Sequence, residues 1–231
     1  MIPIGDDQVR GAGPPIVNWA LIALSTVVFV YEVTLSAPAL EHLVGSYGVV
    51  PATVLQGQGL LTLLTSMFLH GGWLHLIGNM LFLWVFGDNI EAVLGHVGYL
   101  VFYLLGGLAA TGGQILASTT STVPSIGASG AIAAVLGAYI VMFPRSRVRV
   151  LLFLGLFVTV TRVRALVFLG IWIVTQFLYG FASLGPSTAQ TEGVAWFAHI
   201  GGFAFGLAAG VLMRGRARQL EYRVYDVQRR W

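Results

Sequence analysis

The fold of this chain is decided by residues 127–143, which read GASGAIAAVLGAYIVMF. The run contains no charged residue, and Pro144 follows it directly, where a helix normally ends. At 15 residues, 129–143 is short for a helix that crosses a bilayer, because crossing takes about 20 apolar residues. We therefore predict a membrane helix whose first residue, Ser129, lies below the membrane surface and inside the protein.

The composition places the whole chain in lipid. Of its 231 residues, 57% are hydrophobic and 9% are charged, whereas a soluble domain carries about 25% charged residues. The chain has no cysteine, which excludes thiol catalysis, cysteine-based zinc sites and disulfides. It also has no lysine, which excludes a serine–lysine dyad. The basic pI does not indicate nucleic-acid binding, because the arginines flank apolar segments, where membrane topology explains them.

Six apolar segments are candidate membrane spans, of which 129–143 is the shortest. They are residues 16–35, 73–90, 97–117, 129–143, 165–183 and 193–213. We predict an all-α polytopic membrane protein of six transmembrane helices, residues 16–213. A short N-terminal segment, 1–15, precedes this bundle, and an arginine-rich tail, 214–231, follows it.

Two connections contain apolar stretches of their own. Residues 36–72, between the first two spans, are long enough to dip into the membrane interface. Residues 148–160 are apolar but too short to span, and arginines flank them on both sides. We predict that this second segment lies on, or dips into, the membrane surface.

The arginines segregate to one side of the predicted topology. Six spans put both termini on one side, together with Arg10, the five arginines of residues 144–164 and the six of the tail. The loops on the opposite side contain none. By the positive-inside rule both termini are predicted to be cytoplasmic. An arginine-only, six-span chain also favours a bacterial plasma membrane.

Four polar residues fall at one depth near the opposite, outer face. His75 and Asn79 lie early in the second span, Ser129 opens the fourth, and His199 lies about one and a half turns into the sixth. Polar groups inside a bilayer are costly and usually functional. This arrangement predicts a shared site, although the sequence alone does not prove that the side chains touch.

Ser129 and His199 are the candidate catalytic pair. A serine hydroxyl becomes nucleophilic when a base takes its proton, and a helix N-terminus favours the negative charge of a tetrahedral intermediate. Gly202 and Gly206 follow His199 on one helix face and permit close packing against the fourth span. The alternatives are that Ser129 only caps a helix and that His199 only bonds a neighbouring helix.

His75 and Asn79 are four residues apart and share a helix face, so both can donate hydrogen bonds to an oxyanion. Polar contacts between helices are the alternative role. His70 is expected to order the preceding loop. No carboxylate lies at the depth of His199, so we predict a Ser-His dyad oriented by packing. We predict no metal and no cofactor, because the spacing of His70 and His75 is not that of a zinc motif.

These residues resemble the rhomboid family of intramembrane serine proteases, over residues 16–213. The resemblance rests on Gly127-Ala128-Ser129-Gly130, on His199 with Gly202 and Gly206, on His70, His75 and Asn79, and on Glu91 with Gly95. It implies Ser129 as nucleophile and His199 as base. The amide of Ser129, with His75 and Asn79, would form the oxyanion hole. His70, Gly127, Ala128, Gly130, Gly202, Gly206 and Glu91 would support the site.

The resemblance also implies a membrane-embedded first loop at 36–72, a cap formed by the loop 184–192, and single-span membrane proteins as substrates. Two positions depart from the family's frequent pattern. Leu61-Thr62 stands where Trp-Arg is common, and Ala133 stands where an aromatic side chain often stacks on the base.

The sequence is compatible with two other functions. One is a catalytically inactive rhomboid-like protein that binds membrane helices, although such a protein would be free to lose Ser129 or His199. The other is a small channel or transporter, which predicts inverted repeats that the sequence does not contain. The expected partners are the lipid bilayer and transmembrane substrates, with no nucleic acid.

Overall fold

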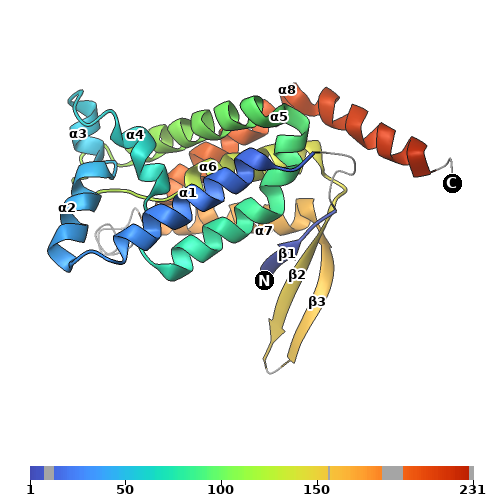
Figure 1. Ribbon diagram of the computed structural model, residues 1–231, viewed down its shortest axis with the longest axis horizontal. Coiled ribbons are helices and arrows are strands. Elements are labelled where there is room, and N and C mark those ends of the chain that lie inside the picture. Colours follow the sequence, from blue (N-terminus) through green and yellow to red (C-terminus); the bar gives the residue numbers. More distant parts are fainter. Residues whose placement is uncertain (8–12, 156, 184–194, 229–231) are drawn as a thin grey trace.

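The protein is a mostly helical bundle with a small sheet at one end and a group of short helices at the other (Figure 1). The computed structural model describes residues 1–7, 13–155, 157–183 and 195–228. Arg10 and the loop 184–192, which was predicted to cap the site, lie outside the described residues. We call the end that carries the sheet the arginine end, and the opposite one the serine end.

The long helices account for every segment predicted to span the membrane. The helices are α1 (Ile16–Glu32), α2 (Ala37–Tyr47), α3 (Pro51–Leu55), α4 (Thr62–Thr65), η1 (Ser66–Phe68), α5 (Trp73–Ala117), α6 (Ser129–Met142), α7 (Ala165–Ala182) and α8 (Trp196–Gln228). The connection 36–72 is therefore largely helical. The tail continues α8 as far as Gln228.

Three of the described helices are long and apolar enough to cross a membrane, namely α5, α7 and residues 196–217 of α8. Two shorter apolar helices, α1 and α6, accompany them. Within α5, Gly95 has φ 72° and ψ 166°, a conformation outside the helical region that glycine adopts without steric cost. Gly95 divides α5 into two halves that run in opposite directions in Figure 1, where the sequence predicted two separate spans.

The sheet corrects the prediction of an all-α fold. Strands β1 (Ile2–Gly5), β2 (Arg147–Leu154) and β3 (Phe157–Arg164) form an antiparallel sheet in the order β1-β2-β3. The segment predicted to lie as an apolar stretch on the membrane surface is thus a β-hairpin. Near its base, at residues 147–150 and 161–164, arginine or threonine alternates with valine or arginine (RVRV and TRVR), a period of two that favours strands over helices.

Helix α6 is the centre of the bundle, with 11 of its 14 residues buried. It packs against α8 at backbone distance. A Cβ added at Gly206 would lie 2.0 Å from the carbonyl oxygen of Ala134, and one added at Gly202 would lie 2.1 Å from that of Gly130. Only glycine permits this approach, so the glycine face predicted on the sixth span does bring the two helices together.

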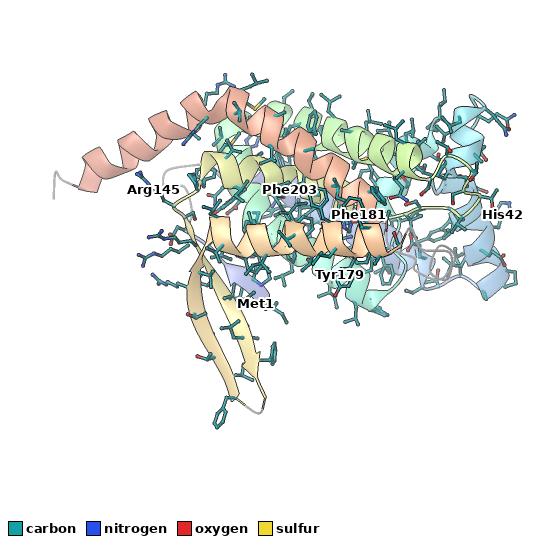
Figure 2. The ribbon with its side chains drawn as sticks, turned by 180° about the vertical axis from the view of Figure 1, so that it is seen from behind. Met1, His42, Arg145, Tyr179, Phe181 and Phe203 are labelled. Carbon is teal, nitrogen blue, oxygen red and sulfur yellow. The ribbon has the colours of Figure 1, made fainter. Side chains whose placement is uncertain are left out.

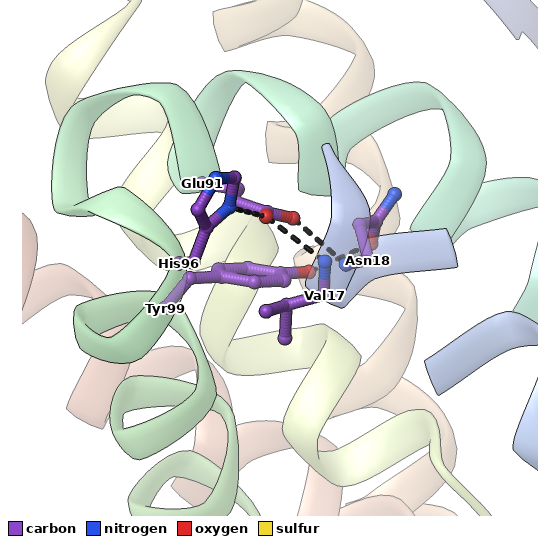
Figure 3. A network of polar contacts seen from close by, with 5 residues as sticks. All are labelled: Val17, Asn18, Glu91, His96 and Tyr99. Carbon is purple, nitrogen blue, oxygen red and sulfur yellow. Dashed lines mark hydrogen bonds and ion pairs between the residues drawn. The ribbon is translucent and has the colours of Figure 1, made fainter. Parts of the chain in front are cut away.

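A buried polar network fixes α1 against α5 near the arginine end (Figure 3). The carboxylate of Glu91 accepts hydrogen bonds from the amides of Val17 (3.0 Å) and Asn18 (2.7 Å), two N–H groups that α1 itself cannot satisfy. Tyr99 donates to the side-chain oxygen of Asn18 at 2.8 Å, and His96 contacts Glu91 at 2.5 Å. Glu91, predicted as a supporting residue, therefore caps α1.

Candidate active site

Ser129 is the first residue of α6, and its hydroxyl does not cap that helix. Ala128 occupies the capping position, and no side chain there bonds the free amides of the first turn. The capping role considered for Ser129 is therefore not what the structure has. Gly127, two residues before Ser129, has φ 130°, a backbone conformation that residues with a side chain rarely adopt.

The structure brings Ser129 and His199 into direct contact. His199 lies in the first turns of α8 and is 7% exposed. Its Nε2 is 2.7 Å from Oγ of Ser129. This is the geometry in which a histidine can accept the proton of a serine hydroxyl.

Gln176 is the residue that sequence reasoning missed. It lies on α7, is 6% exposed, and its Oε1 is 2.7 Å from Nδ1 of His199. Its Nε2 donates to the carbonyl oxygen of Trp172 at 3.1 Å, which leaves the amide oxygen for His199. An acceptor at Nδ1 places the ring proton there, so that Nε2 is free to accept from Ser129. A lone glutamine in the apolar segment 165–183 was the available signal.

Two tryptophans flank the imidazole of His199. The ring of Trp172 lies 5.8 Å away at 39°, and that of Trp196 lies 6.0 Å away at 88°. Ala133, which stands where an aromatic residue was expected to stack on the base, is fully buried in α6. The aromatic contacts to His199 thus come from α7 and α8.

His75 and Asn79 lie on the first turns of α5, and the ring of His75 lies beside Gly127, just before the start of α6. Nδ1 of His75 accepts from the amide of Gly71 at 3.3 Å, which makes Nε2 the protonated nitrogen of the neutral ring. A Cβ added at Gly127 would lie 2.8 Å from this Nε2 and 3.6 Å from Oγ of Ser129. Glycine thus leaves open a space between a donor and the serine.

Asn79 is 8% exposed, and its Nδ2 has no hydrogen-bond partner among the described residues. An unpaired buried donor costs about 1–3 kcal/mol and calls for an explanation. The alternative role of Asn79, a hydrogen bond between helices through this donor, is therefore not found among the described residues.

His70 holds the end of the connection 36–72 in place. Its amide donates to both carboxylate oxygens of Glu32 on α1, at 3.2 and 3.3 Å, and its ring packs edge-on against that of His75. A loop-ordering role, as predicted, fits these contacts.

A small cavity of about 30 Å³ adjoins the serine. Its polar lining comes from Ser66, Thr111, Gln114, Ser125 and Ser129. A volume of this size holds one or two water molecules if polar partners are present, as they are here.

Comparison with known proteins decides the family. The model of the rhomboid domain matches residues 57–216, which run from α4 into the membrane-length part of α8 and include both Ser129 and His199. The chain belongs to the rhomboid family. A rhomboid with these apolar helices is an integral membrane protein. Contact with lipid is consistent with its exposed apolar side chains, such as Leu74 on α5 and Phe181 on α7. Phe181 is labelled in Figure 2.

Curated relatives agree with this placement. The rhomboid is 33% identical over 162 residues to RHOMBOID-like protein 4 of Arabidopsis thaliana, covering 69% of this chain and 36% of that protein. It is 35% identical over 127 residues to the rhomboid protease GluP of Bacillus subtilis, covering 54% of this chain and 24% of that protein. The mitochondrial presenilin-associated rhomboid-like protein A of Danio rerio is 34% identical over 94 residues, covering 40% of this chain and 24% of that protein. The match thus spans only a quarter to about a third of these relatives.

Proposed function

We propose that the protein is an intramembrane serine endopeptidase that cleaves single-span membrane proteins near the outer end of their transmembrane helix. The observation that carries this proposal is the 2.7 Å contact between Nε2 of His199 and Oγ of Ser129 at a buried helix N-terminus. Family membership supports it, since a relative is a rhomboid protease.

In the proposed reaction Ser129 is the nucleophile and His199 the general base. As Oγ of Ser129 attacks the scissile carbonyl carbon, its proton passes to Nε2 of His199. The imidazolium then returns that proton to the leaving amine, and the acyl chain stays on the serine. Water attacks the ester with His199 again as base, releasing the acid and restoring the serine.

The oxyanion is assigned to the open space beside Gly127. The amide of Ser129 in the first turn of α6, Nε2 of His75 and the unpaired Nδ2 of Asn79 are the proposed donors. A developing negative charge there would supply the partner that Asn79 lacks in the free protein. Gly127 supports this role because a side chain at that position would fill the space.

The proposed topology has six spans within residues 16–213, with α5 contributing two. Residues 1–15 and the arginine-rich tail 214–231 would then lie in the cytoplasm, and 36–72 would form a membrane-embedded first loop. Arginine segregation supports this orientation, and a bacterial plasma membrane is the proposed location. Ser129 would open toward the outer face.

The proposed substrates carry small residues at the cut and a helix that unwinds easily. A helical peptide bond is shielded by its own backbone, so it must unfold before Ser129 can reach it. Water for hydrolysis would come from the cavity lined by Thr111, Gln114 and Ser125.

The decisive test is labelling by a fluorophosphonate, which reacts with activated serines. Detergent-solubilised wild type is compared with Ser129→Ala and His199→Ala, and a thermal melt of each verifies the fold. Labelling of wild type alone supports the proposed function. Equal labelling of His199→Ala contradicts the assigned base. No labelling of a folded wild type, with a smaller probe also unreactive, contradicts catalysis and favours the inactive helix-binding alternative.

A further inference from the structure

The β2–β3 hairpin is the part of the protein that the protease site does not use. Its pairing is unbroken from Arg147 opposite Arg164 to Leu154 opposite Phe157. Near its base, Val148 and Val150 are fully buried against the bundle. Beyond them the hairpin leaves the bundle and runs crosswise to α7 (Figures 1 and 2).

Four arginines stand on one face of the hairpin base. The register places Arg147 directly opposite Arg164, and Arg149 directly opposite Arg162. Like charges in directly opposite positions destabilise a sheet. All four side chains are exposed, and none forms a salt bridge with an acidic group in the described part of the chain. The carboxylate of Asp7 accepts a hydrogen bond from the backbone amide of Arg147 at 2.9 Å, but no acidic side chain among the described residues pairs with the four guanidinium groups, so these are available to anions outside the protein.

The tip of the hairpin is apolar and exposed. Phe153, Phe157, Val158 and Val160 are 56%, 78%, 58% and 56% exposed. Such a cluster on a two-stranded ribbon marks a surface that contacts another apolar medium. Aromatic and aliphatic side chains next to arginines are the composition of segments that lie in a membrane interface.

Chain continuity places the hairpin at the membrane. Arg164 ends β3, and Ala165 begins α7, a candidate membrane span, with no linker between them. The hairpin base is therefore level with the end of α7. Because the hairpin runs crosswise to α7, its strands, about 25 Å long, follow the plane of the membrane and not its normal.

We propose that this hairpin is a lipid anchor that binds anionic phospholipids of the leaflet at the arginine end. The tip side chains, Phe153 and Phe157 among them, insert at the boundary of the acyl chains. The four arginines bind headgroup phosphates, which removes the repulsion across the two strands. The anchor rests on the protein being in a membrane and not on the proposed catalysis.

The absence of cysteine allows the hairpin to be tested at a single site. Phe157→Cys is labelled with the environment-sensitive dye NBD, and the full-length protein is reconstituted into vesicles of phosphatidylcholine alone or with phosphatidylglycerol. Lipids spin-labelled near the headgroup serve as quenchers. The charge variant is Arg149→Gln/Arg162→Gln, and the matched control is Arg214→Gln/Arg216→Gln, which removes two exposed arginines of α8. Thermal melts in detergent verify each fold.

The expected result is blue-shifted, quenchable emission that is stronger in anionic vesicles. A basic residue near an anionic surface contributes about a five-fold factor, so the hairpin variant should shift the inserted-to-free ratio by about 25-fold while the control leaves it unchanged. Water-like, unquenched emission in vesicles would overturn the proposal. Quenching that is equal in both kinds of vesicle, and equal in the charge variant, would overturn it as well. A blue shift that grows with protein density without quenching by the lipids would also overturn it, and would indicate a protein partner.

Discussion

Replacing Gln176 by methionine should slow the reaction of Ser129 without unfolding the protein. Methionine matches glutamine in shape but offers no strong acceptor to Nδ1 of His199, 2.7 Å from the present amide oxygen. His199 is 7% exposed, so bulk water cannot replace that acceptor. The tautomer of His199 with its proton on Nε2 then becomes the more stable one. In that tautomer Nε2 donates a hydrogen bond to Ser129 and cannot accept the proton of its hydroxyl.

The magnitude follows from the lost hydrogen bond. Leaving a buried donor unpaired costs about 1–3 kcal/mol, which corresponds to roughly a five- to 150-fold loss of rate if the whole cost falls on the productive tautomer. Gln176→Glu restores an acceptor at the same place. It should therefore react faster than Gln176→Met.

The assay is the second-order rate of fluorophosphonate labelling in detergent. Thr26→Val serves as the control, because Thr26 lies in α1 and its hydroxyl bonds, among the described residues, only the carbonyl oxygen of Ile22 in the same helix. Its labelling rate should equal that of wild type. Wild-type labelling of a folded Gln176→Met would refute the inference that Gln176 sets the tautomer of His199.

Four further predictions concern single residues. Asn79→Leu should lower the labelling rate by about 100-fold, because it removes a proposed oxyanion donor. The melting temperature should stay level or rise, since the variant also removes an unpaired buried donor. A lower melting temperature would show that Asn79 has a structural role. Gly206→Ala should lower the free energy of unfolding by about 1–3 kcal/mol, because the added Cβ meets the carbonyl oxygen of Ala134 in α6. Gly170→Ala, whose added Cβ meets nothing within 4 Å, should not have this effect. Equal effects of the two variants would contradict the packing argument. Glu91→Gln should lower stability by about 1–3 kcal/mol, as one oxygen cannot serve both amides of α1, and an unchanged melt would remove Glu91 as a cap. Burial raises the pKa of Asp6 from 3.8 to about 7, so the folded state holds this proton more tightly than the unfolded state does. The melting temperature should therefore fall as pH rises from about 4 to about 7 and then level off. Asp6→Asn should flatten this part of the pH profile, and a slope that persists in the variant would belong to another group.

The helices were predictable because a membrane imposes length and polarity on every span. The segments 129–143 and 165–183 differ from α6 and α7 by a single residue at one end. The pairing of α6 with α8 was predictable for a related reason, since glycines four residues apart at Gly202 and Gly206 mark a face of close approach. The proximity of Ser129 and His199 follows from that packing.

The sheet and Gln176 were not predicted, for different physical reasons. Residues 148–160 are as apolar as a short membrane segment, and hydropathy outweighed the period-two alternation that marks β2 and β3. The third strand comes from Ile2–Gly5, far away in sequence, and its register depends on tertiary contacts. Gln176 is neutral, and the expected partner of a catalytic histidine is a carboxylate, although an amide oxygen accepts the same hydrogen bond.

The break at Gly95 also bears on how the protein enters a membrane. The two apolar halves of α5 are joined by the short stretch 91–96, with the break at Gly95, so no long linker separates them during synthesis. We therefore expect the two halves to enter the bilayer together, as one helical hairpin. The orientation of one half would then dictate that of its neighbour, and the side on which His75 and Asn79 lie would be set once, when this hairpin inserts.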